Sequence, residues 1–98
     1  MLNMNVFVKF IGFPELRNII EKKSLEVDIS GNTFSDLLKH FERKYKDGFK
    51  RAVLDSKGNV ETTVQVLKND KLWIKRDNMS EEIKEKDRII FMRMMGGG

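Results

Sequence analysis

Only one segment of the chain carries a strong helical pattern, and this limits the architectures open to it. Five apolar residues recur at the spacing i, i+3, i+4, i+7 and i+11: Phe34, Leu37, Leu38, Phe41 and Tyr45. This spacing places them on one stripe of a helix. Thr33 followed by Asp36 resembles a capping box and Gly48 is a stop signal, so the sequence predicts a helix over residues 34–46. A single helix covers one face of one sheet.

Strand patterns lie on both sides of this helix. Residues 5–11 and 88–95 are long apolar runs, typical of strands covered on both faces. Apolar and polar residues alternate over residues 25–30, which predicts a strand with one buried face. Two shorter strands are predicted on either side of a tight turn at Asn69-Asp70. Residues 77–85 are polar apart from Met79 and Ile83, which predicts a loop with Ile83 as an apolar plug.

The predicted order is therefore strand, strand, helix, strand, short strand, long strand. If the first and last strands lie side by side at the sheet centre, this arrangement is the β-grasp. That is an α+β fold with a mixed sheet of about four to five strands covered by one main helix. We expect residues 1–95 to form this single domain and residues 96–98 to form a flexible C-terminal tail.

The side chains of the last strand divide between two faces. Ile89 and Phe91 share one face, and Ile90 and Met92 share the other. We expect Ile90 and Met92 to lie in the core. Met94 and Met95 could instead contact a partner, because thioethers repack readily against another surface. For Trp73, an exposed anchor and packing at the sheet edge are both open.

Composition excludes several kinds of chemistry. The chain has no Cys, so it forms no disulfide, iron–sulfur cluster or thiolate zinc site. Its one His, His40, falls off the apolar stripe and is predicted to lie at the surface, so no metal site and no Ser/His/Asp site are expected. Nineteen basic and fifteen acidic residues give a net charge of +4, but the signs are interspersed, which makes nucleic-acid binding unlikely. No stretch approaches the roughly 20 apolar residues of a membrane span, so a cytoplasmic protein without a membrane partner is expected.

The strongest functional signal is the run Gly96-Gly97-Gly98 at the C-terminus. Glycine has no Cβ and loses the most entropy on ordering, so these residues suit reach rather than stability. Extended, they project the carboxylate roughly 10 Å, through a channel too narrow for other residues. A carboxylate becomes an acyl donor once it is adenylated by ATP, and a sulfur nucleophile can then displace AMP. For the glycines alone, a frayed end without a role is the alternative.

Several segments resemble those of one known family, in the same order. They are residues 13–17 (Phe-Pro-Glu-Leu-Arg), residues 31–33 before the helix, residues 66–70, and residues 86–91 before the glycine end. The chain thereby resembles the sulfur-carrier branch of the ubiquitin-like proteins. This branch includes the small subunit of molybdopterin synthase, the thiazole-biosynthesis sulfur carrier and the ubiquitin-related modifier. The chain differs from the family where Asp70 and Lys86 replace glycines, and where Arg93-Met94-Met95 replaces a Pro-Pro pair.

The resemblance implies a carrier rather than an enzyme. Gly98 would be adenylated by an activating enzyme of the ubiquitin-activating-like family and converted to a thiocarboxylate, with Gly96, Gly97, Met94 and Met95 contacting partners. No cofactor is expected in the chain itself, because it lacks a phosphate-binding loop and the ATP would be bound by the partner. The first expectation is the molybdopterin synthase small subunit in molybdenum cofactor biosynthesis, acting with the large subunit. A protein modifier, a tRNA-thiolation carrier and a passive β-grasp interaction module remain alternatives.

Overall fold

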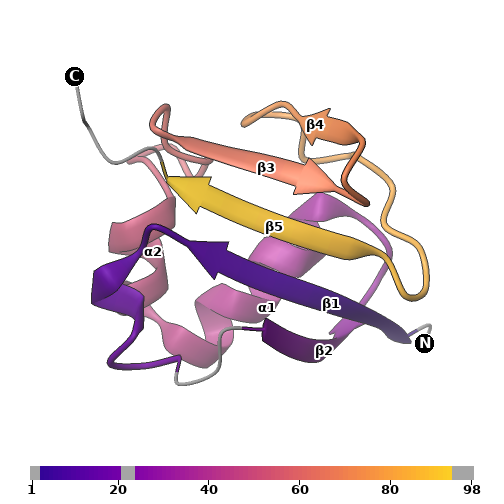
Figure 1. Cartoon of the computed structure of the whole chain (residues 1–98), viewed down its shortest axis with the longest axis horizontal. Helices are drawn as coiled ribbons and strands as arrows, with labels where there is room; N and C mark the ends of the chain where they lie inside the picture. The colour runs from indigo at the N-terminus through magenta and orange to yellow at the C-terminus, as the bar shows by residue number, and fades with distance from the viewer. Residues whose placement is uncertain (1–2, 21–23, 94–98) are drawn as a thin grey trace.

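The computed structural model describes residues 3–20 and 24–93 of the chain. The elements, in order, are β1 (Asn3–Ile11), a 3₁₀ helix η1 (Pro14–Leu16), β2 (Ser24–Ser30), α1 (Phe34–Tyr45), α2 (Asp47–Val53), β3 (Val64–Lys68), β4 (Leu72–Ile74) and β5 (Arg88–Arg93). The strands form one sheet in the order β2-β1-β5-β3-β4. β1 and β5 are parallel at its centre, and the other neighbours are antiparallel (Figure 1). The predicted β-grasp fold is confirmed.

The main helix begins where the sequence predicts. The Thr33 hydroxyl accepts a hydrogen bond from the backbone N–H of Asp36 at 3.2 Å. The Asp36 carboxylate in turn accepts from the backbone N–H groups of Thr33, at 3.1 Å, and Asn32, at 3.0 Å. The two residues therefore form a complete capping box, which pairs N–H groups that the first helical turn leaves free.

The end of the main helix differs from the prediction. α1 ends at Tyr45, and Lys46 takes a positive φ of 54° that breaks the helical path. Gly48 is not a stop but lies inside α2, a second helix that the sequence reading missed. Phe49, Ala52 and Val53 carry α2 into the core, since all three are buried. The turn at Lys46 is what allows Phe49 to reach the core.

The core joins the sheet centre to both helices through aromatic rings. Phe10 of β1 stacks on Phe91 of β5, with ring centroids 5.1 Å apart, and meets Phe41 of α1 edge to face at 5.4 Å. Phe41 in turn stacks on Phe49 of α2 at 5.4 Å. Each such pair contributes about 0.5–1.5 kcal/mol beyond the burial of its area. The Phe91 ring also meets the rings of Phe41 and Phe49 edge to face, at 6.4 and 6.5 Å, so the middle of β5 contacts both helices.

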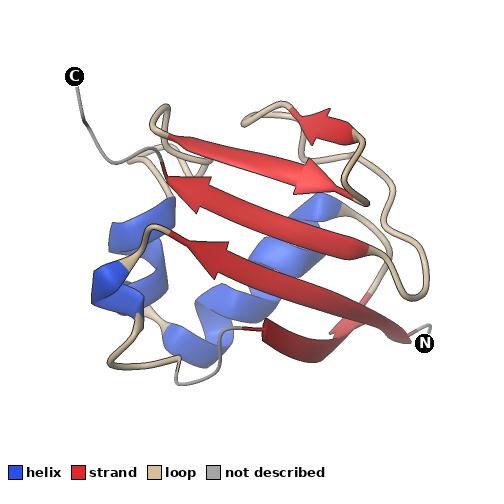
Figure 2. Cartoon of the chain, viewed as in Figure 1, coloured by secondary structure: helices blue, strands red, loops and turns tan. Residues whose placement is uncertain are grey.

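The two faces of the sheet are not equivalent, and here the sequence reading was wrong. Ile89 and Phe91 are fully buried, whereas Ile90 and Met92 lie on the opposite face and are partly exposed. Ile11 of β1, on that same face, is 44% exposed. Both helices pack on one side of the sheet, and the other side is uncovered in the described structure (Figure 2). The outer face therefore keeps apolar side chains in contact with solvent.

Two further expectations can be compared with the structure. Ile83 is completely buried, so its predicted role as a plug is confirmed. Its loop is held by Lys68, whose Nζ donates to the Glu81 carboxylate at 2.6 Å and to the Glu82 carbonyl at 3.0 Å. His40, in contrast, is half-buried rather than at the surface. Burial, followed by the nearby positive charge of Lys44, lowers the pKa of its imidazole.

Candidate functional site: the end of the last strand and the outer sheet face

The residues predicted to carry the chemistry lie outside the described part of the chain. They are Gly96, Gly97 and Gly98, with Met94 and Met95 before them. The part of the site that the structure describes lies just before these residues, and it ends with Arg93 at the end of β5.

Arg93 is held from several directions. Its Nε donates to the Gly12 carbonyl at 3.1 Å. Its two terminal nitrogens pair with the two oxygens of Glu15, with Nη1 and Oε2 2.8 Å apart. Its guanidinium also lies over the Phe13 ring, 4.8 Å from the centroid. These four residues, Gly12, Phe13, Glu15 and Arg93, are called the clamp below.

Each charge of the clamp stabilises the other. The hydrogen bond from Arg93 lowers the pKa of the Glu15 carboxyl below its usual 4.5, against a smaller opposing effect of burial. The same bond raises the pKa of the Arg93 guanidinium. Both groups are therefore ionised at neutral pH. A fork-on-fork pair of this kind fixes geometry better than a single ion-pair contact does.

The outer sheet face carries an apolar strip that ends beside the clamp. Strand register places Leu67 between Trp73 and Ile90, and it places Met92 beside Ile11. Trp73 is 54% exposed and Ile11 44% exposed. These five residues are called the outer strip below. Exposed apolar side chains grouped in this way on a small domain indicate an interaction surface.

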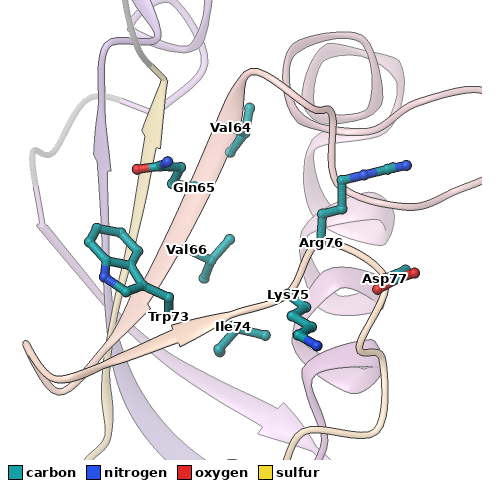
Figure 3. Close-up of a pocket in the computed structure, with 8 residues that line it drawn as sticks. All are labelled: Val64, Gln65, Val66, Trp73, Ile74, Lys75, Arg76 and Asp77. Carbon is teal, nitrogen blue, oxygen red and sulfur yellow. The ribbon is translucent and has the colours of Figure 1, made fainter.

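A shallow hollow of about 350 Å³ flanks the strip at the sheet edge. It opens where β4 stops pairing with β3, and it is lined by Val64, Gln65, Val66, Trp73, Ile74, Lys75, Arg76 and Asp77. Figure 3 shows Trp73 and Gln65 pointing to one side of the sheet and Val66 and Ile74 to the other. Arg76 is already engaged by Asp55 at 3.2 Å. Because Trp73 lines the hollow, its indole is accessible from the edge of the sheet.

Neither a metal centre nor a membrane helix is found in the part of the chain that the structure covers. Among residues 3–20 and 24–93, no group of three or more His, Cys, Asp or Glu is placed to hold a metal ion. No helix within these ranges is long and apolar enough to cross a bilayer.

A mixed five-stranded sheet of this order, with both α-helices on one face, is the ubiquitin-like β-grasp fold. The sequence profile of the ThiS family matches residues 12–98, and the chain belongs to that family. The resemblance to the ubiquitin-like sulfur carriers, inferred from ordered sequence segments, is thereby confirmed. No curated protein sequence matches the chain.

Several solved structures share the fold. SAMP1 from Haloferax volcanii has a TM-score of 0.73 at 19% identity, with 96% of this chain and 99% of SAMP1 covered. Urm1 from Trypanosoma brucei has a TM-score of 0.73 at 20% identity, with coverage of 100% and 99%. A chain of the BexX/CysO complex from Amycolatopsis orientalis has a TM-score of 0.72 at 20% identity, with coverage of 95% and 99%. At these identities the likeness establishes the fold alone.

The clamp and the outer strip were both missed as sites in the sequence reading. The sequence places Glu15 in a segment that resembles the family and Arg93 where the chain departs from the family, and neither pattern indicates a contact between them. A signal was nevertheless present, because Gly12 directly follows a strand and precedes Pro14, which marks a forced turn. The strip was missed because Ile90 and Met92 were assigned to the core.

Proposed function

We propose that the chain is a sulfur carrier whose reactive group is the carboxylate of Gly98. A carboxylate oxygen attacks the α-phosphorus of ATP in a partner enzyme, and pyrophosphate leaves. Hydrosulfide then attacks the acyl carbon, the bond from that carbon to the AMP oxygen breaks and AMP leaves, which produces a terminal thiocarboxylate. The observation that carries this proposal is the ThiS family match, which extends to Gly98. The fold is consistent with it, since β5 lies at the centre of the sheet and ends at Arg93, five residues before Gly98 in the sequence.

In this proposal the folded domain is bound by partner enzymes and takes no part in the chemistry itself. The partner supplies the ATP site and the sulfur, and the domain supplies recognition. We assign that recognition to the outer strip, because it is apolar, exposed and continuous with the end of β5 at Met92. Removing one exposed aromatic anchor from an interface costs up to about 2–4 kcal/mol of binding.

The pathway that we propose to test first is molybdopterin synthesis, with the synthase large subunit receiving the thiocarboxylate. Its support is the sequence resemblance of residues 13–17 and 86–91. The second candidate is a protein modifier, in which the activated Gly98 forms an isopeptide bond with a lysine. This alternative is kept because a chain of the same fold, 18% identical with a TM-score of 0.68, is described as a small archaeal modifier protein 1.

Intact-mass spectrometry tests the carrier function. The chain is incubated with ATP, sulfide and an activating enzyme of the ubiquitin-activating-like family, and the expected product has one oxygen replaced by sulfur. A chain lacking Gly97 and Gly98 is the control and should stay unchanged. Higher-mass adducts that depend on Gly98 would favour the modifier instead. Two results would contradict both functions. One is an unchanged mass with an enzyme that adenylates a known carrier, and the other is a natural protein that continues past Gly98 and is not trimmed.

Variants of the outer strip test docking separately. Trp73→Ala and Ile11→Ser should lower the affinity for the activating enzyme by about tenfold or more while the domain stays folded. Ile19→Ser is the matched control, because Ile19 is 40% exposed but lies outside the sheet. Equal binding by all three variants, measured by isothermal titration calorimetry, would remove the outer strip as the docking surface.

A further inference from the structure

The end of β5 is held on its β1 side by a side chain rather than by strand pairing. β1 pairs with β5 as far as Ile11 and Met92, and the chain then turns away at Gly12. Arg93, one residue further along β5, pairs only with Val64 of β3 among the described strands. The Arg93 side chain fills the missing place by binding the Gly12 carbonyl and Glu15.

The backbones at this point are also in direct contact. A Cβ added to Gly12 would stand 2.4 Å from the Arg93 carbonyl oxygen, a distance that no side chain tolerates. Gly12 also has a φ of +86°, a conformation that L side chains rarely adopt. The approach of residue 12 to residue 93 therefore depends on glycine. Side-chain and backbone contacts fix the same point of the chain, just before residues 94–98.

We propose that the clamp is a positioning device that sets the place and direction from which residues 94–98 continue. This inference rests on the proposed carrier function and adds a role for Arg93, Glu15 and Gly12 in it. Five residues can span at most roughly 17 Å, so the position of Arg93 limits where the terminal carboxylate can reach. The outer strip ends at Ile11 and Met92, beside the clamp. For a partner docked on the strip, the residues after Arg93 therefore always start from the same position.

The physical benefit is a smaller loss of entropy on binding. A carboxylate that starts from one origin explores less space before it enters the partner's active site. Correct placement of reacting groups is itself a large contribution to rate. The role proposed for the clamp is this placement and not the chemistry, so Arg93 is a positioning residue and not a catalytic one.

Paramagnetic relaxation tests the positioning without any partner. Because the chain has no Cys, a single Met95→Cys substitution can carry a nitroxide label at one site. With the clamp intact, we expect line broadening concentrated on amides near η1 and the adjacent end of β3. Arg93→Gln should spread and weaken this broadening, and Glu15→Gln should do the same from the other side of the pair. Arg88→Gln, which breaks the 2.9 Å ion pair with Asp70 at the opposite end of β5, is the matched control.

The kinetics of adenylation provide the second readout. With an activating enzyme that charges the wild-type chain, Arg93→Gln should raise the KM for the carrier by about three- to tenfold, the factor expected when one more segment must be ordered on binding. The kcat should change less than twofold, because no catalytic group is removed. The double variant Glu15→Arg/Arg93→Glu restores the pair and should recover part of the loss.

The two proposals fail in distinguishable ways. Relaxation patterns that are identical in wild type, Arg93→Gln and Glu15→Gln would overturn the clamp proposal, whether or not the chain is a sulfur carrier. An unchanged KM in folded Arg93→Gln would overturn it as well. If relaxation changes as expected but no adenylate forms on the wild-type chain, the clamp still positions the C-terminus and the carrier function is what fails.

Discussion

At the scale of single residues, Gly12 shows how one missing Cβ can organise a surface. Gly12→Ala should destabilise the domain by about 2–4 kcal/mol, since it combines a strained φ with a clash against the Arg93 carbonyl. Gly58→Ala is the matched control: its φ of +84° is nearly the same, but no heavy atom lies within 4 Å of an added Cβ. Urea unfolding of both variants measures the difference. Equal losses would show that backbone strain alone matters and that the contact with Arg93 does not.

The residue scale also shows where sequence reasoning stops. Arg93 and Glu15 are 78 positions apart, and nothing in the local pattern of either residue indicates the other. Their pairing depends on β1 and β5 being parallel neighbours whose register ends one residue before Arg93. The glycine end could be proposed as a site from sequence, because that proposal depends only on neighbouring residues. The clamp could not, because it exists only after the sheet has formed.

At the scale of elements, the N-terminus of α1 makes a pH prediction. The hydrogen bond from Thr33 is the largest effect on Asp36, and it lowers the pKa of the carboxyl below its usual 3.8. A carboxyl with a depressed folded pKa stabilises the fold above its unfolded pKa, and this contribution is lost as pH falls through the folded pKa. The stability of the domain should therefore decrease as pH falls below about 4. In Asp36→Asn this part of the pH dependence should be smaller.

Thermal unfolding between pH 2.5 and pH 7 measures this effect. Asp47→Asn is a suitable control, because Asp47 also lies in the first turn of a helix, α2, but that helix has no capping box like the one that Asp36 forms with Thr33. The proposed role of the capping box predicts that Asp36→Asn also costs about 1 kcal/mol at pH 7. A pH profile of Asp36→Asn that overlays the wild-type profile would contradict the assignment.

The turn between α1 and α2 makes the second prediction at this scale. Lys46 is exposed and has φ 54° and ψ −133°, a region that strongly favours glycine. Lys46→Gly should stabilise the domain by about 0.5–2 kcal/mol because it relieves this strain. Lys44→Gly, at an exposed position inside α1, should instead destabilise it by about 1 kcal/mol. A loss of stability in both variants, measured by urea unfolding, would show that Lys46 is not strained.

The elements that could be predicted from sequence are those with local signals. The order of the strands along the chain follows from the spacing of apolar residues and from runs of β-branched residues. The start of α1 follows from the capping pair at Thr33 and Asp36. The end of α1 and the existence of α2 could not be predicted, because a lysine adopts a backbone conformation that its type disfavours. The buried face of β5 was assigned wrongly since both faces are equally apolar. Only the position of the helices decides that Phe91 points inward.

At the scale of the whole molecule, the proposed function predicts that folding and reactivity depend on different parts of the chain. The described core extends from Val6 to Phe91, and the clamp ends at Arg93. Residues 97 and 98 are glycines with no side chain to bury. Deleting Gly97 and Gly98 should therefore change the melting temperature by less than about 2 °C, which corresponds to well under 1 kcal/mol for a domain of this size. The same deletion should abolish adenylation, because it removes the acceptor carboxylate from its place.

Arg93→Gln should have the opposite effects to that deletion, so stability and adenylation are compared in both proteins. Because Glu15 is partly open to solvent, which screens the pair, loss of the Arg93 guanidinium should cost at most about 1 kcal/mol of stability. Adenylation should persist with a raised KM. The deletion thus removes activity while leaving stability intact, whereas Arg93→Gln lowers stability slightly and keeps the chemistry. Calorimetry and pyrophosphate exchange on the two proteins measure both quantities. A large loss of stability in the deletion would mean that the glycine end is part of the fold, and the separation of the folded domain from its reactive end would be wrong.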